Sequence, residues 1–235
     1  ILSVRYNETN ITDRCLYDAY EKITIGLPVK DDKRSKDVLK LVSYHEIGHA
    51  LIVGLFREMF DLQKITINSN KNGAGGYTLF TPKDEYNSFP TKRFMLANMI
   101  VAMGGRAAEV IILGGSWDKK NLNYNSKLVF PDINNLDVTT GASNDLKQAN
   151  SIARKYISLF GLGKNMGLYD SGDTSQPFLG RQLATDGNKI SEYTKQEIDK
   201  EIEDLVVYSY EMAVHILMRN KKVFNELAER LVEEK

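Results

Sequence analysis

The stretch VSYHEIGHALIVG, residues 42–54, constrains the fold more than any other part of the chain. At about 100° per residue, its apolar positions recur along one stripe of an α-helix. His45 and His49 lie in that stripe one turn apart, so both imidazoles can reach a single cation, and Glu46 flanks them. We therefore predict a buried helix that carries a metal site.

The alternative is a helix whose histidines belong to an ordinary core, because buried histidines are more often structural than ligating. Two inward imidazoles without a metal would each need a buried hydrogen-bond partner. The chain has three histidines in all, which makes a chance pairing at this spacing less frequent. We favour zinc, with Glu46 as the group that takes a proton from the attacking water.

A zinc ion used for hydrolysis needs a third protein ligand and keeps one position open. A histidine six residues after His49 is absent, because that position is Leu55. His215 lies far along the chain in an apolar helix, and we expect it to belong to the core. Glu109 and Asp145 are the carboxylate candidates, and spacing alone does not choose between them.

Apolar periodicity predicts a mainly α-helical chain with one small β-hairpin. KITIN at 64–68 and YTLFT at 77–81 alternate and are joined by a glycine-containing turn. We expect helices at 11–25 and 91–113, and a helix that begins after a cap at Ser35 and carries the two histidines. Three more are expected in the second half of the chain: one capped by Ser143 that ends at Gly161, a long one that begins at Ser191, and a last one after Asn220. GGRAA at 104–108 indicates close packing of that backbone against a neighbour, and 114–136 and 163–190 are predicted to be long loops.

Composition narrows the possible partners and compartments. The 31 basic and 31 acidic residues balance, so no global field favours nucleic acid. Cys15 is the single cysteine, which excludes an intrachain disulfide and favours a reducing compartment. The longest apolar run is far short of the ~20 residues that cross a bilayer. We expect this fragment to be soluble, and its start without methionine indicates a piece of a longer protein.

Several segments in register resemble the peptidase domain of FtsH-type proteases. They are YHEIGHALI, GGYTLF, MGGRAAEVI, DVTTGASNDLKQANSIAR and PFLGR, and the likeness begins near Leu16. The resemblance implies a mainly helical fold with a small strand pair beside the helix that carries the metal ligands. It also implies that residues 1–26 end the segment that joins an ATPase to the peptidase, and that 27–235 form the zinc peptidase domain.

The same resemblance implies roles for individual residues. His45, His49 and Asp145 would hold one Zn²⁺, and Glu46 would be the general base. Glu109 would then belong to a structural helix, and it stays the fallback ligand. The segment GGYTLF corresponds to the strand on which a substrate is laid, which here comprises Gly76, Tyr77, Thr78, Leu79 and Phe80.

For the whole protein, the resemblance implies a membrane-anchored, ATP-dependent hexamer that degrades unfolded or damaged proteins, including membrane proteins. The ATPase module and the membrane helices would lie in N-terminal segments outside this chain, and the ring could contain one or two kinds of subunit. The expected location is a bacterial inner membrane, a mitochondrial inner membrane or a plastid thylakoid. The alternative function is a ring subunit for assembly or chaperone-like holding, with a structural or idle metal site.

Overall fold

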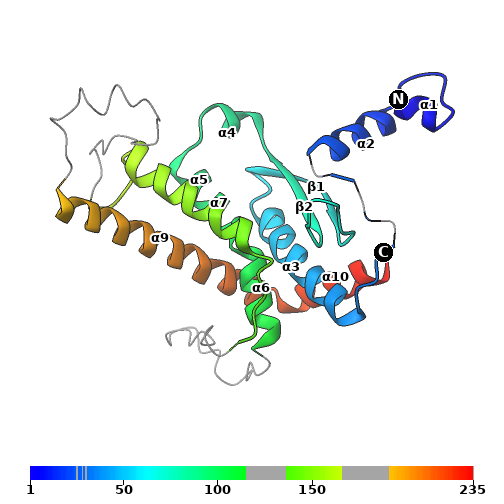
Figure 1. Cartoon of the computed structure of the whole chain (residues 1–235). Coiled ribbons are helices and arrows are strands. Elements are labelled where there is room, and N and C mark those ends of the chain that lie inside the picture. The colour runs from blue at the N-terminus through cyan, green and yellow to red at the C-terminus, as the bar shows by residue number, and fades with distance from the viewer. Residues whose placement is uncertain (25, 28, 30, 115–135, 166–190, 235) are drawn as a thin grey trace.

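The computed structural model describes residues 1–24, 26–27, 29, 31–114, 136–165 and 191–234 (Figure 1). The predicted loops at 114–136 and 163–190 lie almost wholly outside these residues. The described chain is mainly α-helical with one two-stranded sheet, as predicted. The helices are α1 (Leu2–Arg5), α2 (Asp13–Thr24), α3 (Lys36–Leu55), α4 (Asp84–Ser88), α5 (Lys92–Ala102), α6 (Gly104–Leu113), α7 (Ser143–Arg154), a π-helical turn (Lys155–Leu159), α9 (Glu192–Arg219) and α10 (Lys221–Glu233), and the strands are β1 (Phe60–Thr66) and β2 (Tyr77–Pro82).

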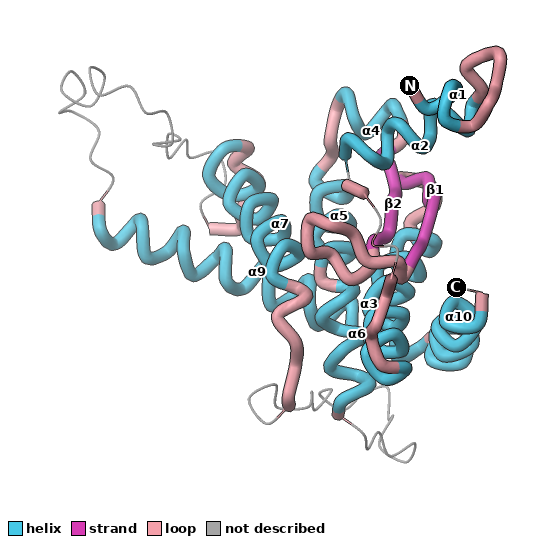
Figure 2. The backbone as a smooth tube through the Cα atoms, turned by 45° about the vertical axis from the view of Figure 1, so that its right-hand side comes forward, coloured by secondary structure: helices cyan, strands magenta, loops and turns pink. Residues whose placement is uncertain are grey.

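Helix α3 is the centre of the fold. Ser35 caps it as predicted, because its side chain accepts the backbone N–H of Val38. From Ser43 to Val53 the helix is buried on most sides, since α6, α10 and the sheet all pack against it. Figures 1 and 2 show α3 between the hairpin and α6, with α10 alongside. Residues on this helix are therefore shielded from water by three different parts of the chain.

The predicted close packing at the glycines is the crossing of α3 with α6. A Cβ atom on Gly104 would lie 2.8 Å from the backbone oxygen of Gly48, and a Cβ on Gly48 would collide with the backbone oxygen of Gly104. No side chain fits between the two backbones at this point. The two glycines thus allow the helices to approach more closely than any other residue type would permit.

Two expectations about helices were wrong in detail. The segment expected to be one helix from 91 to 113 is two helices, α5 and α6, separated at Met103. Ser143 does not cap α7, because Ala142 occupies the N-cap position and the Ser143 hydroxyl donates to the carbonyl of Thr140 instead. Both departures lie close to the cluster of histidines and carboxylates described below.

The hairpin is antiparallel, as the alternating sequence predicted. Its first strand starts at Phe60, earlier than expected, and an irregularity between Leu62 and Lys64 interrupts the register. Within the described part of the chain, β2 pairs along one edge with β1 and has no strand on its other edge. Its residues are all partly exposed. This strand therefore offers an open edge beside α3.

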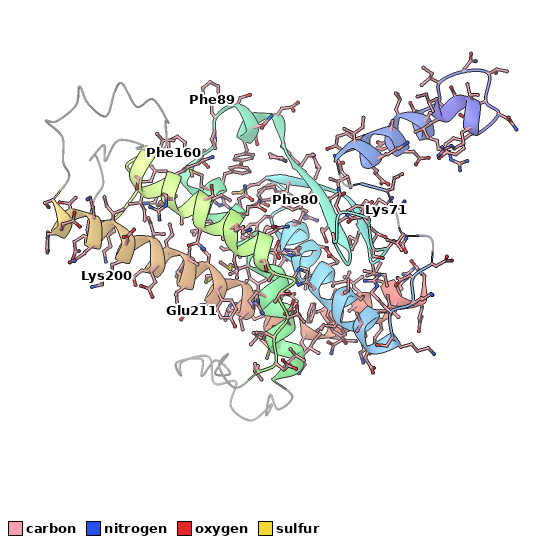
Figure 3. The ribbon with its side chains drawn as sticks, viewed as in Figure 1. Lys71, Phe80, Phe89, Phe160, Lys200 and Glu211 are labelled. Atoms are coloured by element: carbon pink, nitrogen blue, oxygen red, sulfur yellow. The ribbon has the colours of Figure 1, made fainter. Side chains whose placement is uncertain are left out.

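The carboxyl-terminal helices complete the core. Ser191 caps α9 as predicted, and this long helix packs against α5, α6 and α7. Phe224 of α10 is fully buried and meets the Tyr44 ring edge-on at 5.2 Å between centroids. A second group of buried apolar residues joins α5, the π-helical turn and α9, and it consists of Met95, Met99, Ala153, Tyr156, Ile157, Ile198 and Ile202. In Figure 3, Lys200 and Glu211 mark the course of α9.

Two helical stretches are long and apolar enough to cross a membrane by length and composition alone, namely Lys36–Leu55 and Lys92–Leu113. The first is α3 and the second is α5 with α6. Both contribute to the hydrophobic core of the described structure, and core helices of globular proteins pass the same test. They are weak evidence for a membrane span.

Candidate metal centre

Three side chains from two helices meet at one point. His45 and His49 come from α3, and Asp145 comes from the first turn of α7. The two Nε2 atoms lie 3.2 Å apart, and Asp145 Oδ2 lies 3.2 Å from His45 Nε2 and 3.5 Å from His49 Nε2. Within the described residues, this is the group of histidines and carboxylates whose ligand atoms converge closely enough to hold a metal ion.

These separations fit a tetrahedral zinc ion. With Zn–N and Zn–O distances near 2.0–2.1 Å, ligand atoms at neighbouring corners of a tetrahedron lie about 3.3 Å apart. The three observed separations are 3.2, 3.2 and 3.5 Å. Two imidazole nitrogens with one carboxylate oxygen form a ligand set found in catalytic zinc sites, where a fourth position stays free for water.

The second ring nitrogen of each imidazole, Nδ1, contacts a group that holds the ring in place. Nδ1 of His49 lies 2.7 Å from the carbonyl oxygen of Val101, to which it can donate, and Nδ1 of His45 lies 2.9 Å from Oε1 of Glu109. An Nδ1–H that donates outward leaves Nε2 with a lone pair directed at the centre. Both rings are thus oriented for ligation by groups that do not themselves enter the site.

Glu109, the fallback ligand, lies on the far side of His45 from the point where the three ligand atoms meet. It is 1% exposed. Its carboxylate accepts the backbone N–H and the hydroxyl of Thr139, each at 3.0 Å, and an N–H of Arg106 at 3.2 Å. Asp145 therefore occupies the Nε2 side of His45 and Glu109 the Nδ1 side. Sequence reasoning missed the contributions of Val101 and Thr139, because these contacts join segments distant in the chain, and it missed the local pair of Arg106 with Glu109, three residues apart in α6.

The electrostatics of the cluster follow from burial and from paired opposite charges. In the chain without metal, burial lowers the pKa of His45, but hydrogen bonds to the carboxylates of Asp145 and Glu109 outweigh it and raise that pKa to about 10; a metal ion would have to replace the proton on Nε2. Burial disfavours the charged form of Asp145, yet the hydrogen bonds from His45 and His49 hold its pKa well below the ordinary value. The pKa of Glu109 is lowered in the same way, mainly by His45 against the effect of burial.

Glu46 lies next to the two histidines, on the side of α3 that faces β2. It is 6% exposed, and burial raises the pKa of its carboxyl group. The hydroxyl of Thr78 lies 2.9 Å from Glu46 Oε2 and 3.0 Å from the Glu46 backbone oxygen. A carboxylate with a raised pKa beside a metal centre is suited to accept a proton near neutral pH.

Helix α6 closes one side of the centre with backbone alone. A Cβ atom at Gly105 would lie 2.6 Å from His49 Nε2 and would collide with the His45 ring. Any side chain at this position would therefore displace the imidazoles. Gly105 is a residue of the site that the sequence indicated only as part of a tightly packed GG pair.

The segment predicted to receive substrate is β2 together with Gly76. Tyr77, Thr78, Leu79 and Phe80 all lie in the strand and are partly exposed. The ring of Phe80, labelled in Figure 3, packs edge-on against Phe60 at 5.5 Å between centroids. Thr78 brings this strand into direct contact with Glu46, so the strand lies beside the candidate catalytic group.

The sequence pattern of peptidase family M41 matches residues 32–119 and 126–235, which is most of the chain. The chain belongs to peptidase family M41. It is 32% identical to the ATP-dependent zinc metalloprotease FtsH of Trieres chinensis and 35% identical to FtsH 3 of Synechocystis, in each case over 99% of its own length. It is 32% identical to the chloroplastic FTSH 1 of Arabidopsis thaliana, again over 99% of the chain.

These matches confirm the resemblance to FtsH-type proteases. The chain spans about a third of the length of these relatives, with 33%, 35% and 30% of their sequences covered. The chain is thus a domain of peptidase family M41, and the relatives that it matches are named ATP-dependent zinc metalloproteases. The converging donor atoms of His45, His49 and Asp145 agree with that identification.

Proposed function

We propose that this chain hydrolyses internal peptide bonds of unfolded proteins, with Zn²⁺ held by His45, His49 and Asp145 and with Glu46 as the general base. The observation that carries the proposal is the convergence of two Nε2 atoms and one carboxylate oxygen at separations that suit tetrahedral zinc. Bound zinc supplies Lewis-acid chemistry, because it polarises the scissile carbonyl and lowers the pKa of a water molecule.

In this proposal, Glu46 transfers the proton. Its carboxylate accepts a proton from the attacking water and then donates it to the leaving amine, so one residue serves as base and as acid. Burial supports this role because it raises the pKa of Glu46 toward the working range. His45 and His49 keep their Nε2 atoms directed inward through the Nδ1 contacts to Glu109 and Val101.

Strand β2, with Gly76, is the proposed site of substrate binding. Within the described residues its second edge has no strand partner, and an extended peptide can add to such an edge through main-chain hydrogen bonds. Main-chain bonds do not distinguish side chains, so this mode of binding suits a protease that acts on many unfolded sequences. The contact between Thr78 and Glu46 supports a peptide path close to the base.

The wider setting is also a proposal. We infer that the whole protein is an ATP-dependent hexameric protease anchored in a membrane, with its ATPase outside this chain and with unfolded or damaged proteins as substrates. The names of the relatives support ATP dependence, and their sources include cyanobacteria and chloroplasts. A division into a connecting segment at 1–26 and a peptidase domain at 27–235 is supported by the family match, which starts at 32.

The first experiment measures zinc and cleavage together in the full-length protein. Wild type should contain about one zinc per chain by elemental mass spectrometry and should degrade an unfolded protein. Glu46→Gln should keep the zinc and lose cleavage by about 10²- to 10⁴-fold, as expected when a general base is removed. Unchanged cleavage by this variant would show that the proposed mechanism is wrong. A zinc-loaded wild type that binds unfolded chains without cutting them would instead favour a holding or assembly role.

A further inference from the structure

We propose that Thr78 is a positioning residue for Glu46, so that the strand that receives the substrate also aligns the general base. This inference rests on the proposed function, in which Glu46 moves the proton. Its basis is geometric. The Thr78 hydroxyl lies within hydrogen-bond distance of two acceptors of the same residue, Oε2 of the side chain and the backbone oxygen, at 2.9 and 3.0 Å.

The double contact restrains Glu46 in a way that a contact to its carboxylate alone would not. The hydroxyl has one hydrogen to donate, and both acceptors lie within its reach. Because one acceptor is the fixed backbone of α3 and the other is the carboxylate, the contact ties the end of a flexible side chain back to its own helix. A glutamate side chain without such a contact samples several rotamers, and ordering it costs conformational entropy. Thr78 therefore selects one orientation of the carboxylate.

In that orientation the two carboxylate oxygens have different partners. Oε2 accepts from Thr78, while in the described part of the chain no group donates to Oε1. A general base must lie about 2.6–3.2 Å from the proton donor that it serves, and small errors in position cost large factors in rate. A carboxylate whose orientation Thr78 restrains, with its second oxygen left to accept a proton, is suited to this requirement.

The packing of β2 against α3 shows that this contact is built into the fold. Gly76 and Thr78 are two residues apart, so they lie on the same face of the extended chain. A Cβ at Gly76 would lie 3.0 Å from Cγ of Glu46 and 2.7 Å from the backbone oxygen of Thr66. The backbone of this segment is thus pressed against Glu46 itself. A shift of β2 would move the hydroxyl that holds the base.

The test compares substitutions of Thr78 in the full-length protein, with hydrolysis of a short unstructured peptide as the assay, so that unfolding of a protein substrate does not limit the rate. Thr78→Val removes the hydroxyl and keeps the branched shape of the side chain, whereas Thr78→Ser keeps the hydroxyl. Thr194→Val is the matched control, because Thr194 lies in the first turn of α9, outside the proposed site, and its hydroxyl contacts that of Ser191 instead of Glu46.

We expect Thr78→Val to lower kcat about 10- to 100-fold, with KM and zinc content close to those of wild type. Thr78→Ser should retain most of the wild-type kcat, and Thr194→Val should behave as wild type. Wild-type kcat in Thr78→Val would overturn the proposal. A loss in Thr78→Ser as large as in Thr78→Val would also overturn it, because the hydroxyl would then not be the group that matters.

Two further measurements separate this proposal from its alternatives. If Thr78→Val loses zinc or unfolds at lower temperature, Thr78→Ala serves as a second variant without the hydroxyl, and the same defect in both would make Thr78 structural and overturn the proposal. Glu46→Gln is measured in parallel. Full activity of Glu46→Gln would refute the proposed function itself, whereas an inactive Glu46→Gln beside a fully active Thr78→Val would refute only the role of Thr78.

Discussion

Among single residues, Glu109 and Asp145 contact the same imidazole ring from opposite sides. Asp145 lies at Nε2 of His45, where a metal would bind, and Glu109 lies at Nδ1. Carboxylates that hold the outer nitrogen of a ligating histidine fix its tautomer and orientation. Glu109 is in turn held by Thr139 and Arg106. The two carboxylates should therefore affect zinc binding to very different degrees.

We predict that Asp145→Ala removes most of the bound zinc, while Glu109→Ala still binds zinc but with an affinity about 10- to 100-fold lower. The first variant lacks a ligand atom, whereas the second lacks only a group that orients His45. Competition with a chelator of known affinity measures both values, and Glu58→Ala, at an exposed ion pair with Arg93, is the control. Loss of zinc in Glu109→Ala with retention in Asp145→Ala would assign the third ligand to Glu109.

Among the elements, the crossing of α3 with α6 decides how much room the site has. Gly48 and Gly104 bring the two backbones together, and Gly105 lies against the imidazoles of His45 and His49. Glycine inside a helix costs roughly 0.5–1 kcal/mol relative to alanine. Here the cost is offset by a contact that no larger residue allows. Gly54, further along α3, has no atom within 4 Å of a Cβ position and needs no such explanation.

These two kinds of glycine should respond oppositely to alanine. Gly105→Ala should displace the imidazoles and abolish zinc binding, because its methyl group would occupy the space beside both Nε2 atoms. Gly54→Ala should bind zinc normally and should raise the free energy of unfolding by about 0.5–1 kcal/mol. Zinc content per chain and denaturant unfolding measure the two effects. A Gly105→Ala protein with a full complement of zinc would contradict the inferred packing.

At the scale of the whole molecule, the candidate metal centre lies where α7 reaches α3, two helices that make few direct contacts with each other. Helix α3 packs against α6, α10 and the sheet, while α7 packs mainly against α5 and α9. Asp145 is the point at which α7 reaches the two histidines of α3. A metal ion bound at this point would tie the two helices together. Its binding to the folded chain alone stabilises that chain by mass action.

Removal of zinc should therefore lower the unfolding temperature of the wild-type protein. With free zinc at about 100 times its dissociation constant, the lost stability is about 2.7 kcal/mol. Asp145→Ala, which lacks the link, should unfold at the same temperature with and without chelator. Calorimetry or circular dichroism on heating, with and without EDTA, measures the difference. Equal shifts in both proteins would show that the stabilising metal binds elsewhere.

The sequence by itself determined the features that depend on local spacing. Helical periodicity predicted most of the helices, alternation predicted the hairpin, and the separation of four residues put His45 and His49 on one face of α3. The tandem glycines at 104–105 indicated close packing without naming the partner. These predictions succeeded because each depends on neighbours within a few residues along the chain.

Only the tertiary structure decided which distant groups meet. Spacing left Glu109 and Asp145 as equal candidates, and the fold puts one at each nitrogen of His45. It also broke the expected helix at Met103, gave the N-cap of α7 to Ala142, and brought Thr78 to Glu46. The meetings of Thr78 with Glu46 and of both carboxylates with His45 join segments far apart in the sequence, and local periodicity carries no information about such contacts.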